Sequence, residues 1–368
     1  MTLRIHTPLC ERLQIHYPIV QAGMAGGVTS VDMVAGVAEA GGLGTLGAAY
    51  MAPEAIRQAI RNIRAKTERP FAVNLFATSL QDDFSRVEEV ATVLQPIREK
   101  LGIISAEADR TAEVAAKVSS LQTPDRFTEQ FEVLLSEQVP VISTAFGVLP
   151  EDAMREAHAA GCTVIAMVTT VQEAQLAEEK GAHVIVAQGS DAGGHRGTFD
   201  VAKHPHGANV GTFSLVPQIV DSVRIPVIAA GGIMDGRGLV AALALGAQGV
   251  QMGTQFLTTR ESSAHPAYKQ ALWESTEEST TITNAFSGRP ARGLRNAFIE
   301  AVESSGVAPL PFPSQNTITS DIRRAAAAQN EAQYMSLWAG QATRLLNDGV
   351  SAEEVIHRIV DEATRILR

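Results

Sequence analysis

The sequence contains little cysteine and no excess of positive charge. Its 368 residues include two cysteines, Cys10 and Cys162, too few for a disulfide framework or a zinc-binding pattern. The formal net charge of −10 argues against nucleic acid and against an anionic membrane surface as partners. Any anionic substrate must therefore be attracted by positive charge that gathers locally.

Long apolar segments are also absent. The stretch from Met1 to Tyr17 lacks the apolar core of a signal peptide, and no apolar run is long enough to span a membrane. No strand is followed by GxGxxG, a helix and an acidic residue, so a Rossmann dinucleotide site is not indicated. Together with the cysteine content, these absences favour a soluble, cytoplasmic protein that has no membrane partner.

The chain does contain a regular alternation of strand and helix patterns. Short apolar runs end in glycine or polar residues, and a helical pattern follows most of them. The expected strands are residues 18–22, 43–46, 71–75, 139–144, 163–168, 183–187, 226–230 and 247–252. Eight such units predict an α/β protein with a (β/α)8 TIM barrel. A doubly wound sheet is the competing fold, but it does not usually reach eight units.

Two segments do not follow the alternation. The connection after the third strand is too long for a simple crossover, so we expect an insertion there that is largely helical. Beyond residue 258 the sequence indicates helices and loops, and Ser351 with Glu354 predicts a capping box for the last helix. The expected division is a barrel of residues 1–78 and 123–260, and a mainly helical lobe of residues 79–122 and 261–368 over the C-terminal mouth of the barrel.

One loop carries a histidine among glycines. The strand expected at 183–187 runs into Gln188, followed by Gly193, Gly194 and His195. Glycines allow the backbone to approach a ligand closely, and a histidine at the end of a buried strand is placed for acid–base chemistry near neutral pH. The other candidate histidines adjoin prolines, and solvated or structural roles suit them better: His204, His206 and His265.

The last two strands of the barrel end in glycine loops, Gly231-Gly232 and Gly253-Thr254. Loops after strands seven and eight commonly hold phosphate in TIM barrels, and exposed backbone N–H groups favour an anion. One phosphate between two glycine loops suits a mononucleotide. The alternatives are that these loops are only tight turns, or that the barrel binds a phosphorylated metabolite without catalysis.

In combination, these motifs resemble the nitronate monooxygenases, formerly called 2-nitropropane dioxygenases. The resemblance covers residues 17–260 and extends to the segment 284–289. It implies FMN without a metal, oxidation of alkyl nitronates or propionate 3-nitronate with O2, and His195 as the catalytic base. It also implies that FMN is bound by Gln21, Ala22, Gly23, Met24, Asn74, Gln188, Gly193, Gly194, Gly231, Gly232, Gln251, Met252, Gly253 and Thr254. Asp191 departs from the family pattern, because many members have glutamate there.

The resemblance leaves a rival activity open. A related flavoprotein branch with the same fold uses NAD(P)H to reduce enoyl thioesters or quinones. Three clustered arginines, Arg289, Arg292 and Arg295, could attract an anion, although surface charge is the favoured interpretation. Tyr334 and Trp338 are four residues apart on an expected helix, where they would either contribute to the core or form a wall of the pocket. The expected partners are a small-molecule nitronate and O2, and a homodimer is compatible with this interpretation.

Overall fold

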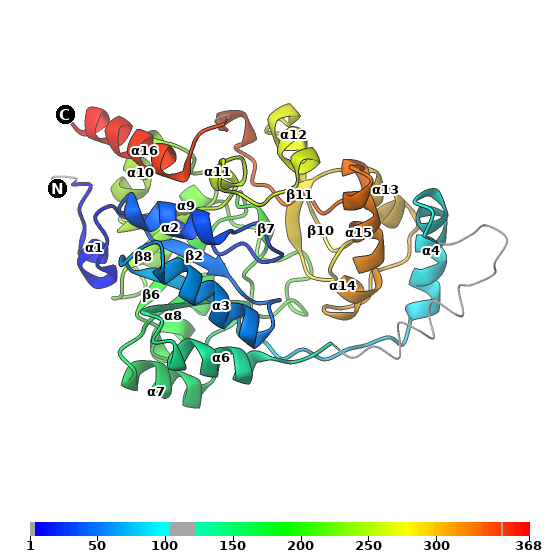
Figure 1. Cartoon of the computed structure of the whole chain (residues 1–368), viewed down its shortest axis with the longest axis horizontal. Coiled ribbons are helices and arrows are strands. Elements are labelled where there is room, and N and C mark those ends of the chain that lie inside the picture. Colours follow the sequence, from blue (N-terminus) through cyan, green and yellow to red (C-terminus); the bar gives the residue numbers. More distant parts are fainter. Residues whose placement is uncertain (1–3, 104–122, 347–348) are drawn as a thin grey trace.

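The computed structural model describes residues 4–103, 123–346 and 349–368. Figure 1 shows a barrel on one side and a smaller lobe on the other. The expected insertion is therefore described only in part, since residues 104–122 lie outside the described residues.

Eight parallel strands form the barrel, as the sequence predicts. They follow one another in the order β1-β9-β8-β6-β5-β4-β3-β2. A parallel bridge between Val20 and Leu43 joins the two end strands, so the sheet closes on itself. The strands are β1 (Ile19–Gln21), β2 (Gly44–Gly47), β3 (Phe71–Phe76), β4 (Val141–Ala145), β5 (Thr163–Val168), β6 (Val184–Gln188), β8 (Val227–Ala230) and β9 (Gly249–Met252).

Helices surround the sheet and cover its outer face. Ser30 and Thr170 cap two of them, each accepting a hydrogen bond from the backbone N–H three residues later. The surrounding helices are α2 (Val31–Glu39), α3 (Pro53–Arg64), α6 (Phe127–Ser136), α7 (Glu151–Ala159), α8 (Val171–Glu179), α9 (Thr212–Val220) and α10 (Gly236–Ala244). A short helix, α1 (Pro8–Leu13), closes the N-terminal end, because Leu9 and Leu13 join the cluster inside the barrel that contains Val186 and Ile228. The opposite, C-terminal end is thereby left as the side where a ligand can enter.

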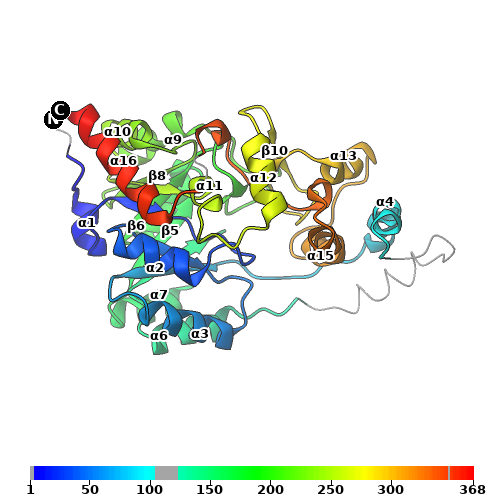
Figure 2. The same cartoon turned by 45° about the horizontal axis from the view of Figure 1, so that its top comes forward.

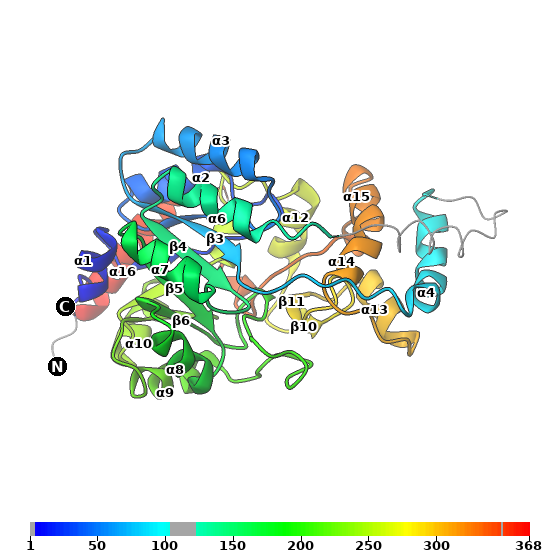
Figure 3. The same cartoon turned by 90° about the horizontal axis from the view of Figure 1, so that it is seen from below.

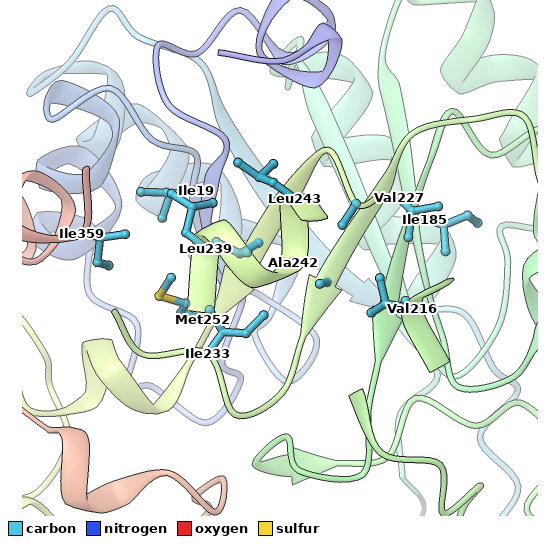
Figure 4. Close-up of a cluster of buried hydrophobic side chains, with 14 of the residues drawn as sticks. Ile19, Ile185, Val216, Val227, Ile233, Leu239, Ala242, Leu243, Met252 and Ile359 are labelled. Carbon is cyan, nitrogen blue, oxygen red and sulfur yellow. The ribbon is translucent and has the colours of Figure 1, made fainter. Parts of the chain in front are cut away.

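The last helix, α16 (Ala352–Leu367), lies on the barrel and not on the lobe (Figure 2). It begins with the predicted capping box of Ser351 and Glu354. Its apolar stripe packs against α10 and α2. Figure 4 shows Ile359 of this helix in the same cluster as Leu239 of α10. The division of the chain into two domains stays a prediction, but this helix within the expected lobe segment extends the core of the barrel.

Replacing Ile356 of α16 with alanine should lower the free energy of unfolding by about 2–5 kcal/mol, the usual cost of truncating a buried aliphatic side chain. Ile356 is 0% exposed. Ile366→Ala is the matched control on the same helix, because Ile366 is 47% exposed. Chemical denaturation of both variants measures the difference. Equal denaturation midpoints would show that α16 contributes nothing to the stability of the barrel.

The lobe has its own hydrophobic core and lies beyond the C-terminal ends of the strands (Figure 3). Leu94, Leu272 and Phe298 meet in this core, although they come from distant parts of the chain. Arg98 is nearly fully buried and binds Asp321, with 2.8 Å between its Nε and Oδ2. The helices of the lobe are α4 (Val87–Lys100), α12 (Pro266–Glu274), α13 (Ala297–Ser304), α14 (Ser314–Ile318) and α15 (Ser320–Ala328). The part of the insertion that is described is thus helical and packs on the later segment.

The lobe also contains strands, which the sequence did not predict. Strands β10 (Thr280–Thr283) and β11 (Ala291–Leu294) form an antiparallel pair. A third, two-residue strand, β7 (Gly194–His195), joins them from the barrel side. The expected helix through Tyr334 and Trp338 is wrong: a short 3-10 helix ends at Tyr334, and Trp338 bridges to Gly293. No helix of the described residues is long and apolar enough to cross a membrane.

Candidate active site

A cavity of about 420 Å³ lies at the C-terminal ends of the barrel strands, beneath the lobe. The ends of β3, β6, β8 and β9 reach it from the barrel, and Ser287, Arg323 and Trp338 reach it from the lobe. It is also lined by nearly all of the cofactor-binding residues expected from the sequence: Ala22, Gly23, Met24, Asn74, Gln188, Gly193, Gly194, Gly231, Gly232, Gln251, Met252, Gly253 and Thr254. His195 lines the same cavity, so residues far apart in the sequence meet at one place.

Gln21 is the exception among the expected residues. It does not line the cavity and is 0% exposed. Its side-chain oxygen accepts a hydrogen bond from the backbone nitrogen of Thr45 at 3.0 Å, and its amide nitrogen donates to the carbonyl of Ala22. The side chain of Gln21 thus ties β1 to β2 inside the barrel, and its expected contact with a cofactor stays a prediction.

The loops after β8 and β9 present free backbone donors. Gly231 and Gly232 have φ angles of 120° and 69°, which favour glycine. Within the described part of the chain, the N–H groups of Gly231, Gly232 and Gly253 have no hydrogen-bond acceptor. The hydroxyl of Thr254 accepts from the backbone nitrogen of Gly340 at 3.0 Å, which leaves its own proton available for a further bond. These donors suit an anion.

The start of α10 is already occupied by a carboxylate of the protein itself. The side chain of Asp235 accepts hydrogen bonds from the backbone N–H groups of Arg237 and Gly238, and so occupies the first turn. Asp191 occupies the start of α9 in the same way: its Oδ2 accepts from the backbone nitrogen of Thr212 at 2.7 Å. An anionic ligand is therefore expected at the glycine loops, where no carboxylate of the described residues accepts hydrogen bonds from the backbone N–H groups.

The backbone that carries His195 is fixed on several sides. His195 pairs with Ala291 of β11. The side chain of Gln188 donates to the carbonyl of His195 at 3.0 Å and accepts from the backbone nitrogen of Gly197 at 2.8 Å. A Cβ on Gly193 would lie 2.4 Å from the backbone nitrogen of Gly340, so this glycine allows the lobe to approach closely. The glycine loop that carries His195 is therefore held by both barrel and lobe.

Among the described residues, the imidazole of His195 has one hydrogen-bond partner, Ser287, which the sequence analysis did not single out. The distance from Nε2 to the hydroxyl oxygen is 2.8 Å. That hydroxyl also donates to the carbonyl of Arg289, at 3.1 Å. Because a hydroxyl has only one proton to donate, this arrangement assigns the proton of the neutral ring to Nε2 and leaves Nδ1 as the basic nitrogen. The one feature of the sequence that pointed to Ser287 is its position in the segment 284–289, to which the family resemblance extends.

Burial keeps the imidazole neutral. The pKa of His195 is lowered from 6.5 to about 3, first by burial and then by the positive charges of Arg289 and Arg323. The guanidinium of Arg289 lies 3.9 Å from the ring centre of Phe146, and Phe146 in turn contacts the ring of His195 edge-on at 5.8 Å. Phe146 has a φ of 72°, an uncommon conformation that often occurs at functional sites.

The expectation of surface charge is wrong for two of the three arginines. Arg289 and Arg292 are buried, at 4% and 8% exposure. Arg292 donates from Nε to the carbonyl of Ser190 at 2.7 Å, and Arg289 donates to the carbonyl of Thr198. Only Arg295 is a surface residue, where it pairs with Glu303 at 3.0 Å. No aspartate or glutamate of the described residues lines the cavity. The charge around the cavity therefore favours an anionic substrate, although the net charge of the protein is negative.

Three other histidines that the sequence analysis considered lie in different surroundings. His265 lines the cavity, but its Nδ1 caps α12 by accepting from the backbone nitrogen of Ala267 at 3.2 Å. His206 is exposed and His204 is half-buried, in the segment that follows β7. Among the described residues, no three side chains of the metal-ligating types gather at one place.

Comparison with known proteins gives a consistent result along the whole chain. A family model described as nitronate monooxygenase matches residues 6–362. A probable nitronate monooxygenase of Staphylococcus haemolyticus is 40% identical, with 98% of this chain and 97% of the relative covered. One from Bacillus subtilis is 38% identical, with coverage of 97% and 99%.

Solved structures show the same similarity. A nitroalkane oxidase from Streptomyces ansochromogenes superimposes with a TM-score of 0.85 and 37% identity, covering 97% of this chain and 98% of that one. FabK from Thermotoga maritima superimposes with a TM-score of 0.76 and 30% identity, covering 99% and 98%. The chain is thus similar to both over its full length, and more similar to the nitroalkane oxidase.

Proposed function

Because this chain belongs to the nitronate monooxygenase family, we propose that it oxidises alkyl nitronates, or propionate 3-nitronate, with O2 at an FMN held in the cavity. His195 is the base in this proposal. The single observation that carries it is a neutral, half-buried imidazole in a cavity that also contains an arginine and is lined by no carboxylate of the described residues.

The free donors of the glycine loops fit the phosphate of FMN. Gly231, Gly232 and Gly253 would donate backbone hydrogen bonds to it, and Thr254 would add its hydroxyl. A Cβ on Gly253 would make only ordinary contacts, at 3.5 Å from Ala22 and Met24, so the missing side chain leaves room in the cavity and is not required by the packing of the barrel. When bound, the flavin supplies the redox chemistry, and the protein supplies position and electrostatics.

His195 can act on the neutral form of the substrate. A nitroalkane carries an acidic C–H bond next to the nitro group, and the basic Nδ1 of the neutral ring can remove that proton. The nitronate that results is an anion, and Arg323 in the cavity wall stabilises negative charge there. Residues of the lobe line the cavity, and the lobe would keep bulk water from it during the reaction, which would strengthen both effects.

Anaerobic mixing tests the proposal against the rival reductase. The purified protein should show a flavin absorption spectrum, and adding ethyl nitronate without O2 should bleach it. NADH should not bleach it at a comparable rate. Rapid bleaching by NADH and none by the nitronate would replace the proposal with the NAD(P)H-dependent reductase of enoyl thioesters or quinones. A colourless protein would favour a barrel that binds a phosphorylated metabolite.

The pH profile should reflect the lowered pKa of His195. A base with a pKa of about 3 stays unprotonated above that value, so kcat/KM for nitroethane should change little between about pH 7.5 and about pH 5. A base with the ordinary value of 6.5 would lose about 30-fold at pH 5, because only the unprotonated fraction reacts. Initial rates across this range measure the difference. A decline centred near pH 6.5 would show that burial and the two arginines do not act on the ring.

A further inference from the structure

A second, smaller cavity of about 140 Å³ adjoins the first one and is not needed for the proposed chemistry. More of its accessible lining is apolar than polar: it includes Leu80, Phe127 and Phe312, and also the charged residues Asp125 and Arg126. Tyr50, Phe76 and Asn316 line both cavities. The two spaces are therefore separated by a single layer of side chains, which we call the partition.

A row of aromatic rings leads from His195 to the partition. Phe146 lies 5.8 Å from His195 between ring centres, and Phe76 lies 4.4 Å from Phe146. Tyr50 contacts Phe76 edge-on at 5.2 Å, and Phe312 does so at 6.2 Å from the side of the small cavity. An apolar chain whose reactive end lies at His195 would thus meet ring surfaces along its length as far as the small cavity.

The two sides of the partition differ in how firmly they are held. Asn316 accepts hydrogen bonds from Arg323 with both its backbone and its side-chain oxygen, at 2.6 and 2.9 Å. The side chain of Tyr50 is 42% exposed, and its hydroxyl has no hydrogen-bond partner among the described residues. The backbone around Tyr50 is nevertheless fixed, because Gln130 donates to the carbonyls of Ala49 and Met51 at 3.2 and 2.8 Å. The ring of Tyr50 can therefore turn without breaking a hydrogen bond.

From these contacts we infer that the small cavity extends the substrate site and receives the alkyl chain of long, unbranched primary nitronates, with Tyr50 as the movable part of the partition. The inference rests on the proposed function, since it assigns the substrate class of the same site. Short nitronates are contained in the main cavity, and only longer chains reach past Tyr50. Tyr50 is thus a specificity-determining residue and takes no part in the chemistry.

Two variants test the inference in opposite directions. Leu80→Trp places a large side chain in the small cavity, and Leu80 does not line the main one. Tyr50→Ala removes the movable part of the partition. Tyr17→Ala is the matched control, since Tyr17 packs on His16 before β1, at the N-terminal end of the barrel.

The measurement is kcat/KM for the nitronates of nitroethane through 1-nitrooctane. In the wild type, each methylene that enters the small cavity should raise kcat/KM by about fourfold, the usual gain for burying one CH2 group. Leu80→Trp should abolish this rise and leave ethyl nitronate unchanged. Tyr50→Ala should shift the preference toward longer chains, and Tyr17→Ala should match the wild type. Identical chain-length profiles in all four proteins would overturn the inference.

A binding measurement separates failure of this inference from failure of the proposed function. Unbranched carboxylates from propanoate to octanoate resemble the nitronates in shape and charge but cannot react. Calorimetric titration should show affinities that rise with chain length in the wild type and stay flat in Leu80→Trp. If no nitronate is oxidised but this pattern holds, the proposed reaction is wrong and the chain-binding site stands. If nitronates are oxidised and the affinity for carboxylates does not depend on chain length in either the wild type or Leu80→Trp, the inference is wrong.

Discussion

The variant His195→Asn should oxidise neutral nitroalkanes about 10²–10⁴-fold more slowly than the wild type, which is the typical contribution of a general base. Asparagine keeps a hydrogen-bonding side chain near Ser287 but cannot take up a proton near neutral pH. Pre-formed nitronates need no deprotonation, so their oxidation should fall much less. The ratio of the two activities, measured as initial rates of O2 consumption, is the decisive quantity.

His357→Asn is the control for this experiment, because His357 is exposed on α16. It should leave both activities unchanged. His195→Asn should also retain its flavin, since the proposed phosphate donors lie on other loops. If His195→Asn keeps flavin and oxidises both substrate forms at the wild-type rate, His195 is a structural residue and the proposed mechanism is wrong. An equal loss on both forms would instead assign the ring to anion binding.

Replacing Gly253 with leucine should greatly lower the flavin content of the purified protein. The branched side chain would fill the space in which phosphate oxygens must approach the backbone N–H groups. Each hydrogen bond to a charged group contributes about 1.5–3 kcal/mol, so losing one should weaken FMN binding about 10- to 100-fold. The flavin-to-protein absorbance ratio after purification measures the loss.

Gly36→Ala is the control for the fold, because a Cβ at Gly36 would meet only Ala352, at 3.8 Å. It should purify with wild-type flavin content. Thermal unfolding of the flavin-free forms should show that Gly253→Leu is still folded. Full occupancy in a folded Gly253→Leu protein would mean that the loop after β9 is only a turn.

Release of the cofactor by heat, followed by chromatography, should yield FMN, and FAD as the main species would contradict a site with one phosphate.

The barrel could be predicted from the sequence because its strands are encoded locally. The strand Val184–Gln188, for example, begins with four apolar residues and is followed by a glycine, and apolar runs of this kind are typical of a parallel sheet buried on both faces. The same logic places the loops after the strands at one end of the barrel. That is why the expected cofactor residues, apart from Gln21, meet in one cavity.

The lobe could not be predicted in the same way, because its order depends on contacts between distant segments. Strand β11 forms in a segment that shows no strand alternation, and it pairs on one side with the two residues of β7. Arg289 and Arg292 can be buried because the carbonyl groups of Thr198 and Ser190 accept hydrogen bonds from their guanidinium groups. Nothing near these arginines in the sequence shows those acceptors, so composition alone placed both residues on the surface.

The pairing of β7 with β11 also constrains the order in which the protein can acquire its activity during synthesis. His195 is synthesised before its partner Ala291, which emerges only after the remaining barrel strands, β8 and β9, and helix α12 of the lobe. Domains generally form as units while the chain is being made, so a barrel can assemble before the imidazole reaches its final position. We therefore expect a ribosome-bound chain that has released the eight barrel strands, but neither β11 nor α16, to be inactive.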